Sequence, residues 1–512
     1  MNDIAKLVEE DLRHEVHPGG VNGRPFWNSE SLFFMYPPSF DFPADPAATG
    51  YRFDVIDAKG RMRFLKVKSP HTSLAAIWPE LPTGWTTVIC RGIDDRADEI
   101  RDAKHLVLTG TRAFWKQAPF TGDYPPAVCG YGECAERAKQ WLFSQDSFKK
   151  FLETRDAANC GYWGLTYPSK MVAAILLALT AGEPGANDLE TARVFADWII
   201  SLAEPADRPL AYFTPTYFKT NNAKRGVTDI YFGQTMLIYP AEVGKALVRL
   251  YMCTKDGKYL AHAKGIAETY LKLQGEDGTW PLKMWLESGK PVCPNRLVPI
   301  DCVTPFLEAL YKVTGDARYR AAADRTFDFI RKGPLTTWNW EGQFEDAQPD
   351  EPYRNLTKHA AASTALYLLD RFLGDKEKLA LARELLRFAE DQFVCWEKPF
   401  PDMPHWEHVQ DVHRWITPCV LEQFYWYVPI DASASKLIRT YLALYRAEGN
   451  PLDLAKAKVL GDAMTHVQKP DGDIPTHWKG ETSCSWWNCI LADIEAMQEL
   501  ETAVSEKAWK MV

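Results

Sequence analysis

The chain has 512 residues, of which 46% are hydrophobic and 25% charged, a composition typical of globular rather than disordered proteins. Its net charge of −9 argues against a nucleic-acid-binding protein, and no run of about 18 uncharged apolar residues could span a membrane. Eleven scattered Cys without a CxxC pair predict neither a disulfide scaffold nor a structural zinc site. The charged segment 1–12 does not resemble a signal peptide, which predicts a cytoplasmic protein, or a periplasmic one if a signal has been removed.

The first part of the chain favours β-structure. Residues 51–57, 61–67 and 85–92 are β-rich runs separated by Gly and Pro turns, and the first two alternate in polarity. Short strands with such turns predict a small antiparallel β-sandwich domain, which we place at residues 1–125.

From about residue 130 the sequence predicts helices in pairs. A Gly or Asp turn followed by an amphipathic helix recurs after Gly182, Asp256, Gly315, Gly374 and Gly449. The predicted helices cover 133–157, 168–181, 188–203, 229–253, 257–273, 301–314, 317–331, 355–372, 376–393, 418–447 with a break near Pro429, 452–468 and 485–501. Every second helix is apolar nearly all round, which is typical of a buried helix. The pattern therefore predicts a mainly α protein with an (α/α)6 toroid as its catalytic domain (126–512), in preference to an open solenoid.

The connections between helix pairs are long, at 204–228, 274–300, 332–354, 394–417 and 469–484. Long loops without secondary structure of their own are uncommon unless they are functional. Because the inner helices of a toroid run parallel, these loops are expected to gather above the N-termini of the inner helices. Helix N-termini favour bound anions, so a binding site is expected at this end.

Tryptophan is concentrated in the same loops. Ten of the 19 Trp fall there or at the start of the last inner helix: Trp280, Trp285, Trp338, Trp340, Trp396, Trp406, Trp415, Trp478, Trp486 and Trp487. Large aromatic faces provide stacking surfaces for sugar rings. We therefore predict that Trp338, Trp340, Trp406, Trp486 and Trp487 bind substrate.

Histidine and arginine are also placed at this end. The His residues concerned are His359, His405, His408, His413 and His477, and four loop arginines, Arg225, Arg296, Arg354 and Arg414, precede predicted inner helices. The His spacing is not HExxH, so we predict no metal and favour hydrogen bonding to substrate by His359 and His413. Four guanidinium groups at one end indicate an anionic group on the ligand, because arginine matches a carboxylate bidentately.

Carboxylates are the candidates for catalysis. Asp229 and Asp301 each stand at the start of a predicted inner helix, where N-capping is the alternative role, and Glu341 lies in the Trp-rich segment WNWEGQFED. Glycosidic hydrolysis needs one carboxylic acid to protonate the leaving oxygen and a second carboxylate to activate water or attack the sugar. The sequence does not choose the pair, because Glu345, Asp346, Glu407 and Asp411 are further candidates. No GxxxxGK[ST], GxGxxG or GxSxG motif is present, and we predict no cofactor.

Two segments resemble known (α/α)6-barrel enzymes that act on carbohydrates. LYKVTGDARYRAAADRTFDFI and QGEDGTWPL are similar to segments of the unsaturated glucuronyl hydrolases and the N-acylglucosamine 2-epimerases. FWNSESLFFMYPPSFDFP and HTSLAAIWPELPTGWTTVICRGID resemble the family 154 glycoside hydrolases, which implies exo-β-glucuronidase activity. Asp229 opens its helix as the catalytic Asp of the unsaturated glucuronyl hydrolases does, but the residues IYFGQTML after it differ from the Met-rich sequence of that family.

The leading hypothesis is a glycoside hydrolase that releases a terminal uronic acid, β-glucuronic acid, from an oligo- or polysaccharide. The alternatives are an unsaturated glucuronyl hydrolase, a uronate-specific lyase using Tyr167, His359 and Arg354, and a non-catalytic glycan-binding protein. The expected partner is a uronic-acid-containing carbohydrate, with no nucleic acid and no membrane, and a homo-oligomer is left open.

Overall fold

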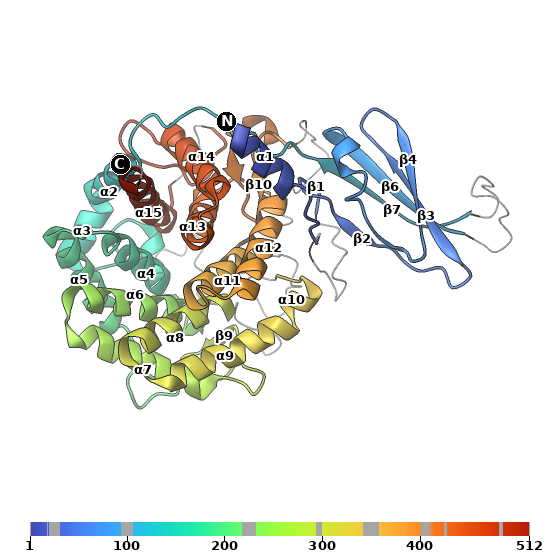
Figure 1. Ribbon diagram of the computed structural model, residues 1–512. Helices are drawn as coiled ribbons and strands as arrows, with labels where there is room; N and C mark the ends of the chain where they lie inside the picture. Colours follow the sequence, from blue (N-terminus) through green and yellow to red (C-terminus); the bar gives the residue numbers. More distant parts are fainter. Residues whose placement is uncertain are drawn as a thin grey trace.

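The computed structural model describes residues 2–17, 19, 31–93, 106–217, 232–292, 300–340, 358–399, 401, 409, 411–423, 427–480 and 485–510. Two rings of helices surround a common axis, and a smaller group of strands extends from one side of them (Figure 1). Among the helices in these ranges, none is both long and apolar enough to cross a membrane.

Six helices form a closed inner ring. In ring order they are α4 (Pro168–Leu179), α6 (Ile238–Thr254), α8 (Ile300–Thr314), α11 (Lys358–Arg371), α13 (Asp431–Glu448) and α15 (Trp487–Lys510). Each helix contacts the next, and α15 contacts α4 and so closes the ring. The predicted inner helices are therefore confirmed as the inner ring.

Six further helices cover the inner ring from outside. They are α2 (Tyr131–Ser144), α5 (Ala186–Ser201), α7 (Gly257–Leu273), α9 (Ala317–Lys332), α12 (Lys376–Phe393) and α14 (Pro451–Val467). Each of α5, α7, α9, α12 and α14 packs on the inner helix that precedes it in the chain, whereas α2 packs on α15, the last one. The mainly α (α/α)6 toroid predicted from the sequence is confirmed.

A recurring corner explains the repeated turns of the sequence. At four inner-to-outer corners a residue with positive φ ends the turn: Lys255, Gly315, Gly374 and Gly449. The next residue caps the outer helix with its side chain, and these caps are Asp256, Asp316, Asp375 and Asn450. Asp and Asn are among the best N-caps, and glycine adopts positive φ without a steric penalty. The Gly–Asp signal therefore encodes tight αα-hairpins.

Three predicted helices are divided or begin later than expected, and the last one, expected to end at residue 501, extends to Lys510 as α15. The helix expected at 133–157 is divided at the extended residue Gln145 into α2 and α3 (Asp146–Thr154). The helix expected at 418–447 with a break near Pro429 begins at Asp431, just after that break, because the residues before it pair as β11 (Cys419–Val420) and as isolated bridges. Similarly, α6 begins at Ile238, after β8 (Gln234–Met236). In the last two cases, pairing between loops replaces the expected first turns of an inner helix.

Within the described residues, the strands at the N-terminal side form two small sheets. The larger has the order β1 (Phe33–Phe34), β7 (Leu106–Lys116), β6 (Gly84–Ile93), β3 (Gly50–Ile56) and β4 (Met62–Val67). All its pairs are antiparallel except β1 with β7, and β2 (Ser39–Asp41) pairs separately with β5 (His71–Ser73). The three predicted strand runs are confirmed as β3, β4 and β6, whereas β7 was not predicted. The sandwich arrangement and the boundary at residue 125 stay predictions.

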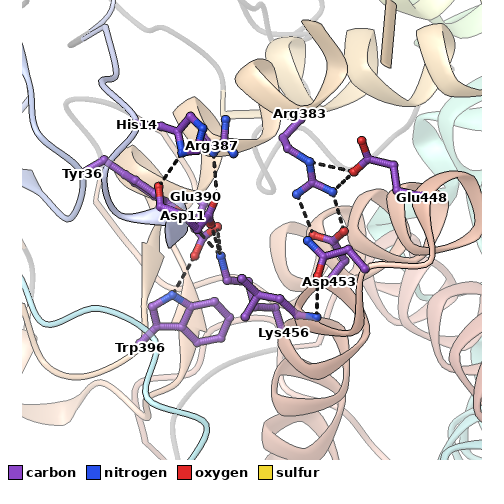
Figure 2. Close-up of polar contacts among 12 residues, drawn as sticks. Asp11, His14, Tyr36, Arg383, Arg387, Glu390, Trp396, Glu448, Asp453 and Lys456 are labelled. Carbon is purple, nitrogen blue, oxygen red and sulfur yellow. Dashed lines mark hydrogen bonds and ion pairs between the residues drawn. The ribbon is translucent and has the colours of Figure 1, made fainter. Parts of the chain in front are cut away.

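A buried charge cluster joins the N-terminal helix to the barrel (Figure 2). The Nζ of Lys456 on α14 lies 2.8 Å from Glu390 Oε2 of α12 and 3.1 Å from Asp11 Oδ2. Asp11 is the last residue of α1 (Asn2–Asp11). Arg387 Nε lies 2.7 Å from Asp11 Oδ1. Burial alone would raise the pKa of Asp11, but Lys456 and Arg387 outweigh it and hold that pKa well below its usual range.

A second buried carboxyl fixes the chain between β1 and β2. Asp391 of α12 accepts hydrogen bonds from the backbone N–H groups of Met35 and Tyr36 at 2.6 and 2.7 Å. Gln117, which follows β7, donates its Nε2–H to the Asp391 carbonyl at 3.0 Å. The segment between β1 and β2 and the segment after β7 are therefore both attached to one helix of the outer ring.

Candidate functional site

The long loops lie at one end of the ring and pair with one another. β8, before α6, pairs with β9 (Lys283–Trp285), which follows α7. β10 (Val394–Cys395), after α12, pairs with β11, and Ile430 at the start of α13 forms a bridge with His477. The described parts of the loops are thus connected above the N-termini of the inner helices, as expected from the parallel direction of those helices.

Five aromatic residues line this end next to the N-termini of α15, α4 and α6. Their ring centroids follow in sequence: His477 to Trp486 at 5.5 Å, Trp486 to Trp163 at 6.5 Å, Trp163 to Tyr167 at 5.9 Å and Tyr167 to Tyr217 at 5.8 Å. We call these residues the aromatic wall. Trp163 is 36% exposed and Trp486 half-buried, so two indole rings of the wall are open to solvent.

The wall is held by contacts behind it. Tyr162 stacks on Trp487 with centroids 3.8 Å apart, and its hydroxyl accepts the backbone N–H of Trp487 at 2.9 Å. The backbone N–H of Trp486 donates to Thr476 Oγ1 at 2.7 Å. A Cβ at Gly164 would lie 2.3 Å from the Tyr162 ring, so glycine is required there for the close approach. The exposed rings are therefore positioned by packed neighbours, as a preorganised binding surface requires.

A buried lysine closes one end of the wall. Lys283 on β9 is fully buried, and its Nζ lies 5.4 Å from the centre of the Tyr217 ring. An ammonium group over an aromatic face is stabilised by the charge distribution of the ring. The wall thus ends at a cationic group.

Most of the predicted loop tryptophans are buried instead of open. Trp280, Trp338, Trp340, Trp396, Trp415, Trp478 and Trp487 are each at most 4% exposed. Trp338 stacks on His17 at 4.2 Å, and Trp340 lies edge-on to Trp338 at 6.2 Å. These rings offer little surface to a ligand and fill the loop interior. The substrate-binding role of Trp338, Trp340 and Trp487 stays a prediction.

Several predicted site residues lie outside the described residues. These are Asp229, Glu341, Arg225, Arg296, Arg354 and Trp406. Asp301 and His359 are the second residues of α8 and α11, so both stand at inner-helix starts as predicted. His413 and Arg414 lie on an exposed 3-10 turn, Val412–Arg414, and a Cβ at Gly480 would lie 3.1 Å from Arg414 Nη2. The structure thereby brings the 411–423 loop against the loop that precedes α15.

Two site features escaped the sequence analysis. Trp163 lies just before α4, the first inner helix, as the other candidate loops lie just before their inner helices. This position in the sequence could have predicted it as a site residue. Asp431 is the first residue of α13, and the tetrapeptide VPID at 428–431 repeats the VPID at 298–301. The repeat places Asp301 and Asp431 at corresponding positions of two inner helices.

Asp431 belongs to a buried carboxyl pair. Its side chain is hydrogen-bonded to that of Asp493 on α15, and both residues are fully buried. The hydroxyl of Ser435 donates to Asp493 Oδ1 at 2.6 Å. Burial and the charge of Asp493 raise the pKa of Asp431 well above its usual range, and burial raises the pKa of Asp493 to about 7. The pair therefore holds a proton near neutral pH.

The interior of the ring below the loops is crossed by an ion-pair network. Glu495 of α15 accepts Arg249 Nη1 of α6 at 2.7 Å and Arg439 Nη1 of α13 at 2.9 Å. Since α4 stands between α6 and α15 in the ring, the Arg249 pair spans non-neighbouring helices. Arg249 and Arg439 stay 31% and 27% exposed. The network therefore places charged groups in the ring interior, below the loops of the candidate site.

Lys245 lies about one turn nearer the loops than Arg249 on α6. Burial lowers its pKa, and the positive charges of Arg439, Lys436 and Arg249 lower it further, while Glu495 acts in the opposite direction. A lysine surrounded by more cations than carboxylates is a favourable partner for an anionic ligand. Within the described residues, no three His, Cys, Asp or Glu side chains are grouped so as to hold a metal ion.

Comparison with known proteins gives a fold likeness at low sequence identity. No family model and no curated protein matches the chain. A cellobiose 2-epimerase from Spirochaeta thermophila is 13% identical, with a TM-score of 0.52 over 74% of this chain and 98% of that chain. A family 76 glycoside hydrolase from a bovine Bacteroides thetaiotaomicron strain is 14% identical, with a TM-score of 0.48 over 91% and 94%. An unsaturated glucuronyl hydrolase specific for heparin is 12% identical, with a TM-score of 0.44 over 74% and 98%. The epimerase likeness supports the assignment of the barrel fold.

Proposed function

We propose that the protein is a glycoside hydrolase that releases a terminal uronic acid, a β-glucuronic acid, from an oligo- or polysaccharide. The observation that carries this proposal is the aromatic wall, with Trp163 and Trp486 open, above a ring interior rich in cations. Indole faces accept the C–H face of a sugar ring, and cations attract its carboxylate. The solved structures with a similar barrel include proteins named for action on carbohydrates.

The position of Asp301 favours the role of the ionised carboxylate. Asp301 is the second residue of α8, and the first turn of a helix is in general favourable for a negative charge because of the helix dipole. Such a group suits a general base or nucleophile, while the acid that protonates the leaving oxygen needs a raised pKa. Asp229 is the corresponding candidate before α6, and Glu341 is the candidate acid.

Replacement by Asn separates catalysis from capping. If Asp301 or Asp229 is catalytic, replacing it by Asn should lower kcat by several orders of magnitude. The melting temperature should change little, because only a helix cap is weakened. Near-normal turnover combined with reduced stability would assign the residue to capping.

The uronate specificity is tested with two matched substrates. Arg296→Ala and Arg354→Ala each remove a guanidinium partner of the carboxylate, a loss of about 2–5 kcal/mol, or about 30- to 5000-fold in kcat/KM. We expect this loss on an aryl β-glucuronide and almost none on residual turnover of the aryl β-glucoside. Equal losses on both substrates would mean that these arginines only hold the loops. An unsaturated product absorbing in the near ultraviolet would identify a lyase instead.

The stacking role is tested on an open ring of the wall. Trp163→Ala is expected to lower kcat/KM by about 2- to 12-fold, the equivalent of an aromatic contact of about 0.5–1.5 kcal/mol. Phe64→Ala is the control, because Phe64 is 56% exposed on β4, outside the loops. An unchanged kcat/KM for Trp163→Ala would remove the wall from the binding site.

A further inference from the structure

Two buried cysteines face each other where the loop carrying His413 and Arg414 begins and ends. Cys395 of β10 and Cys419 of β11 are direct partners in an antiparallel pair, and both are free thiols with no solvent exposure. Their thiol groups are within hydrogen-bonding contact of each other. The residues between them, 396–418, include Trp406 as well as the 3-10 turn that carries His413 and Arg414.

The backbone geometry is compatible with a covalent bond. The N–H of Leu421 donates to the Phe393 carbonyl at 2.8 Å, so these two residues form a hydrogen-bonded pair. Hydrogen-bonded and non-hydrogen-bonded pairs alternate along antiparallel strands. Cys395 and Cys419, two positions further along, are therefore also a hydrogen-bonded pair. Cα atoms in such pairs are about 5.5 Å apart, within the range that a disulfide spans. Cross-strand Cβ atoms are usually about 4.5–5.5 Å apart, against about 3.5–4.5 Å in a disulfide, so closing the bond requires a small approach of the strands.

We propose that Cys395 and Cys419 form a reversible disulfide that fastens the two ends of this loop together. The strain of the required approach makes the bond easier to reduce than a structural disulfide, which is why the pair functions as a redox-dependent fastening. When oxidised, it holds the segment that carries His413 and Arg414 to the end of α12 and the approach to α13.

The oxidant is a small-molecule disulfide such as oxidised glutathione. One thiol loses its proton and attacks a glutathione sulfur, which releases one glutathione thiol and leaves a mixed disulfide. The other protein thiolate attacks the protein sulfur of that mixed disulfide and releases the second glutathione. Two protein thiols are thus oxidised to one S–S bond while one glutathione disulfide is reduced to two thiols. Burial raises the pKa of Cys395, so this exchange is slow in the folded protein.

Mass spectrometry tests the bond directly. The full chain is incubated for hours with oxidised glutathione, quenched in acid, alkylated after unfolding and digested with trypsin. Cleavage after Arg387, Arg414 and Lys436 separates the two cysteines into peptides 388–414 and 415–436, because Lys398 is followed by proline. We expect these peptides to be linked, with the mass of two hydrogens lost, and to separate again after incubation with reduced glutathione.

Internal controls decide the outcome. Cys253 is exposed and should be glutathionylated, which shows that the oxidant is active towards the thiols of this protein. If Cys253 is modified while peptides 388–414 and 415–436 stay unlinked, or if either carries only glutathione, the proposal is wrong. Cys395→Ser should abolish the link and leave Cys419 free.

A second readout needs no variant. Arg414 is exposed, so limited trypsin can cut the native chain there, between the two cysteines. On a denaturing gel, the oxidised and cleaved protein should migrate as one band without reductant and as two fragments with reductant. Two fragments under both conditions, from protein whose Cys253 is glutathionylated, would overturn the proposal.

Discussion

Lys456→Met is the sharpest test of the charge cluster that fastens α1 to the barrel. The substitution keeps the length and apolar stem of the side chain and removes only the ammonium group. That group lies 2.8 Å from Glu390, 3.1 Å from Asp11 and 3.3 Å from the Tyr36 hydroxyl. The side chains of Lys456, Glu390 and Asp11 are 4%, 2% and 10% exposed, so water replaces little of what is lost.

The magnitude follows from the charges left behind. With Lys456 and Arg387 the two carboxylates are balanced, and without Lys456 one buried negative charge is uncompensated. Removing one partner of a buried pair costs about 3–5 kcal/mol. For 512 residues the unfolding entropy is about 1.1 kcal/mol/K, so the melting temperature should fall by about 3–5 °C.

The pH dependence gives the reasoning a second check. The folded-state pKa of Asp11 is lowered, so its contribution to stability is present above the unfolded pKa of about 3.9 and is lost as the pH falls through the folded value. Without Lys456 the carboxylates take up protons more easily. The difference in melting temperature between wild type and Lys456→Met should therefore be largest near pH 7 and shrink towards pH 4.

Differential scanning calorimetry at several pH values provides the measurement, and Lys6→Met provides the control. Lys6 is 76% exposed and forms a surface pair with Glu10 at 3.9 Å, so the same substitution should change stability by less than about 0.5 kcal/mol. Equal melting temperatures for wild type and Lys456→Met at pH 7, or a difference that grows on acidification, would refute the account of the cluster.

Three other predictions concern the barrel and its loops. The folded-state pKa of Asp493 is raised, so between about pH 4 and 7 the folded protein holds a proton that the unfolded chain has lost. The free energy of unfolding, measured by urea denaturation, should therefore fall as the pH rises through this window. It should fall less in the Asp493→Asn variant. Gly244→Ala would place a Cβ 2.5 Å from the Phe306 ring between α6 and α8 and should destabilise the folded protein by about 1–3 kcal/mol. Gly257→Ala is the control, because a Cβ there meets nothing within 4 Å and should not lower stability. Similar melting temperatures for both variants would contradict this prediction. Exhaustive chelation should leave glycosidase activity intact, and a loss restored by one divalent ion would show that a metal is needed.

The barrel could be predicted because its determinants are local. The alternation of apolar and amphipathic helices and the Gly–Asp corners, such as that at Gly315, are each contained in a short stretch of chain. The strand pairs β8–β9 and β10–β11 depend on partners distant in the sequence, so their residues were assigned to helices or loops. For the same reason, neither the Asp431–Asp493 contact nor the Cys395–Cys419 contact could be predicted from spacing.

The site was predicted at the level of position rather than of individual side chains. Loop length and helix direction predicted the end of the ring at which the loops gather, since both follow from connectivity. Which Trp rings are open depends on how loops pack on one another, and Trp338 is buried against His17, which precedes it by more than 300 residues. Trp163 was missed because the first connection is short and was not counted among the long loops.

The pairing of α2 with α15 has a consequence for how the chain is made. The first outer helix of the barrel packs on the last inner one, and α15 also contacts α13 and α4. During synthesis the ring therefore stays open until α15 leaves the ribosome, with the buried faces of α2, α4 and α13 exposed to water. Non-local closure of this kind is slow, and it leaves apolar surface available for association with other chains. The nascent protein should depend on chaperones until α15 is complete, and a ribosome stalled before residue 487 should present a chain that trypsin digests readily.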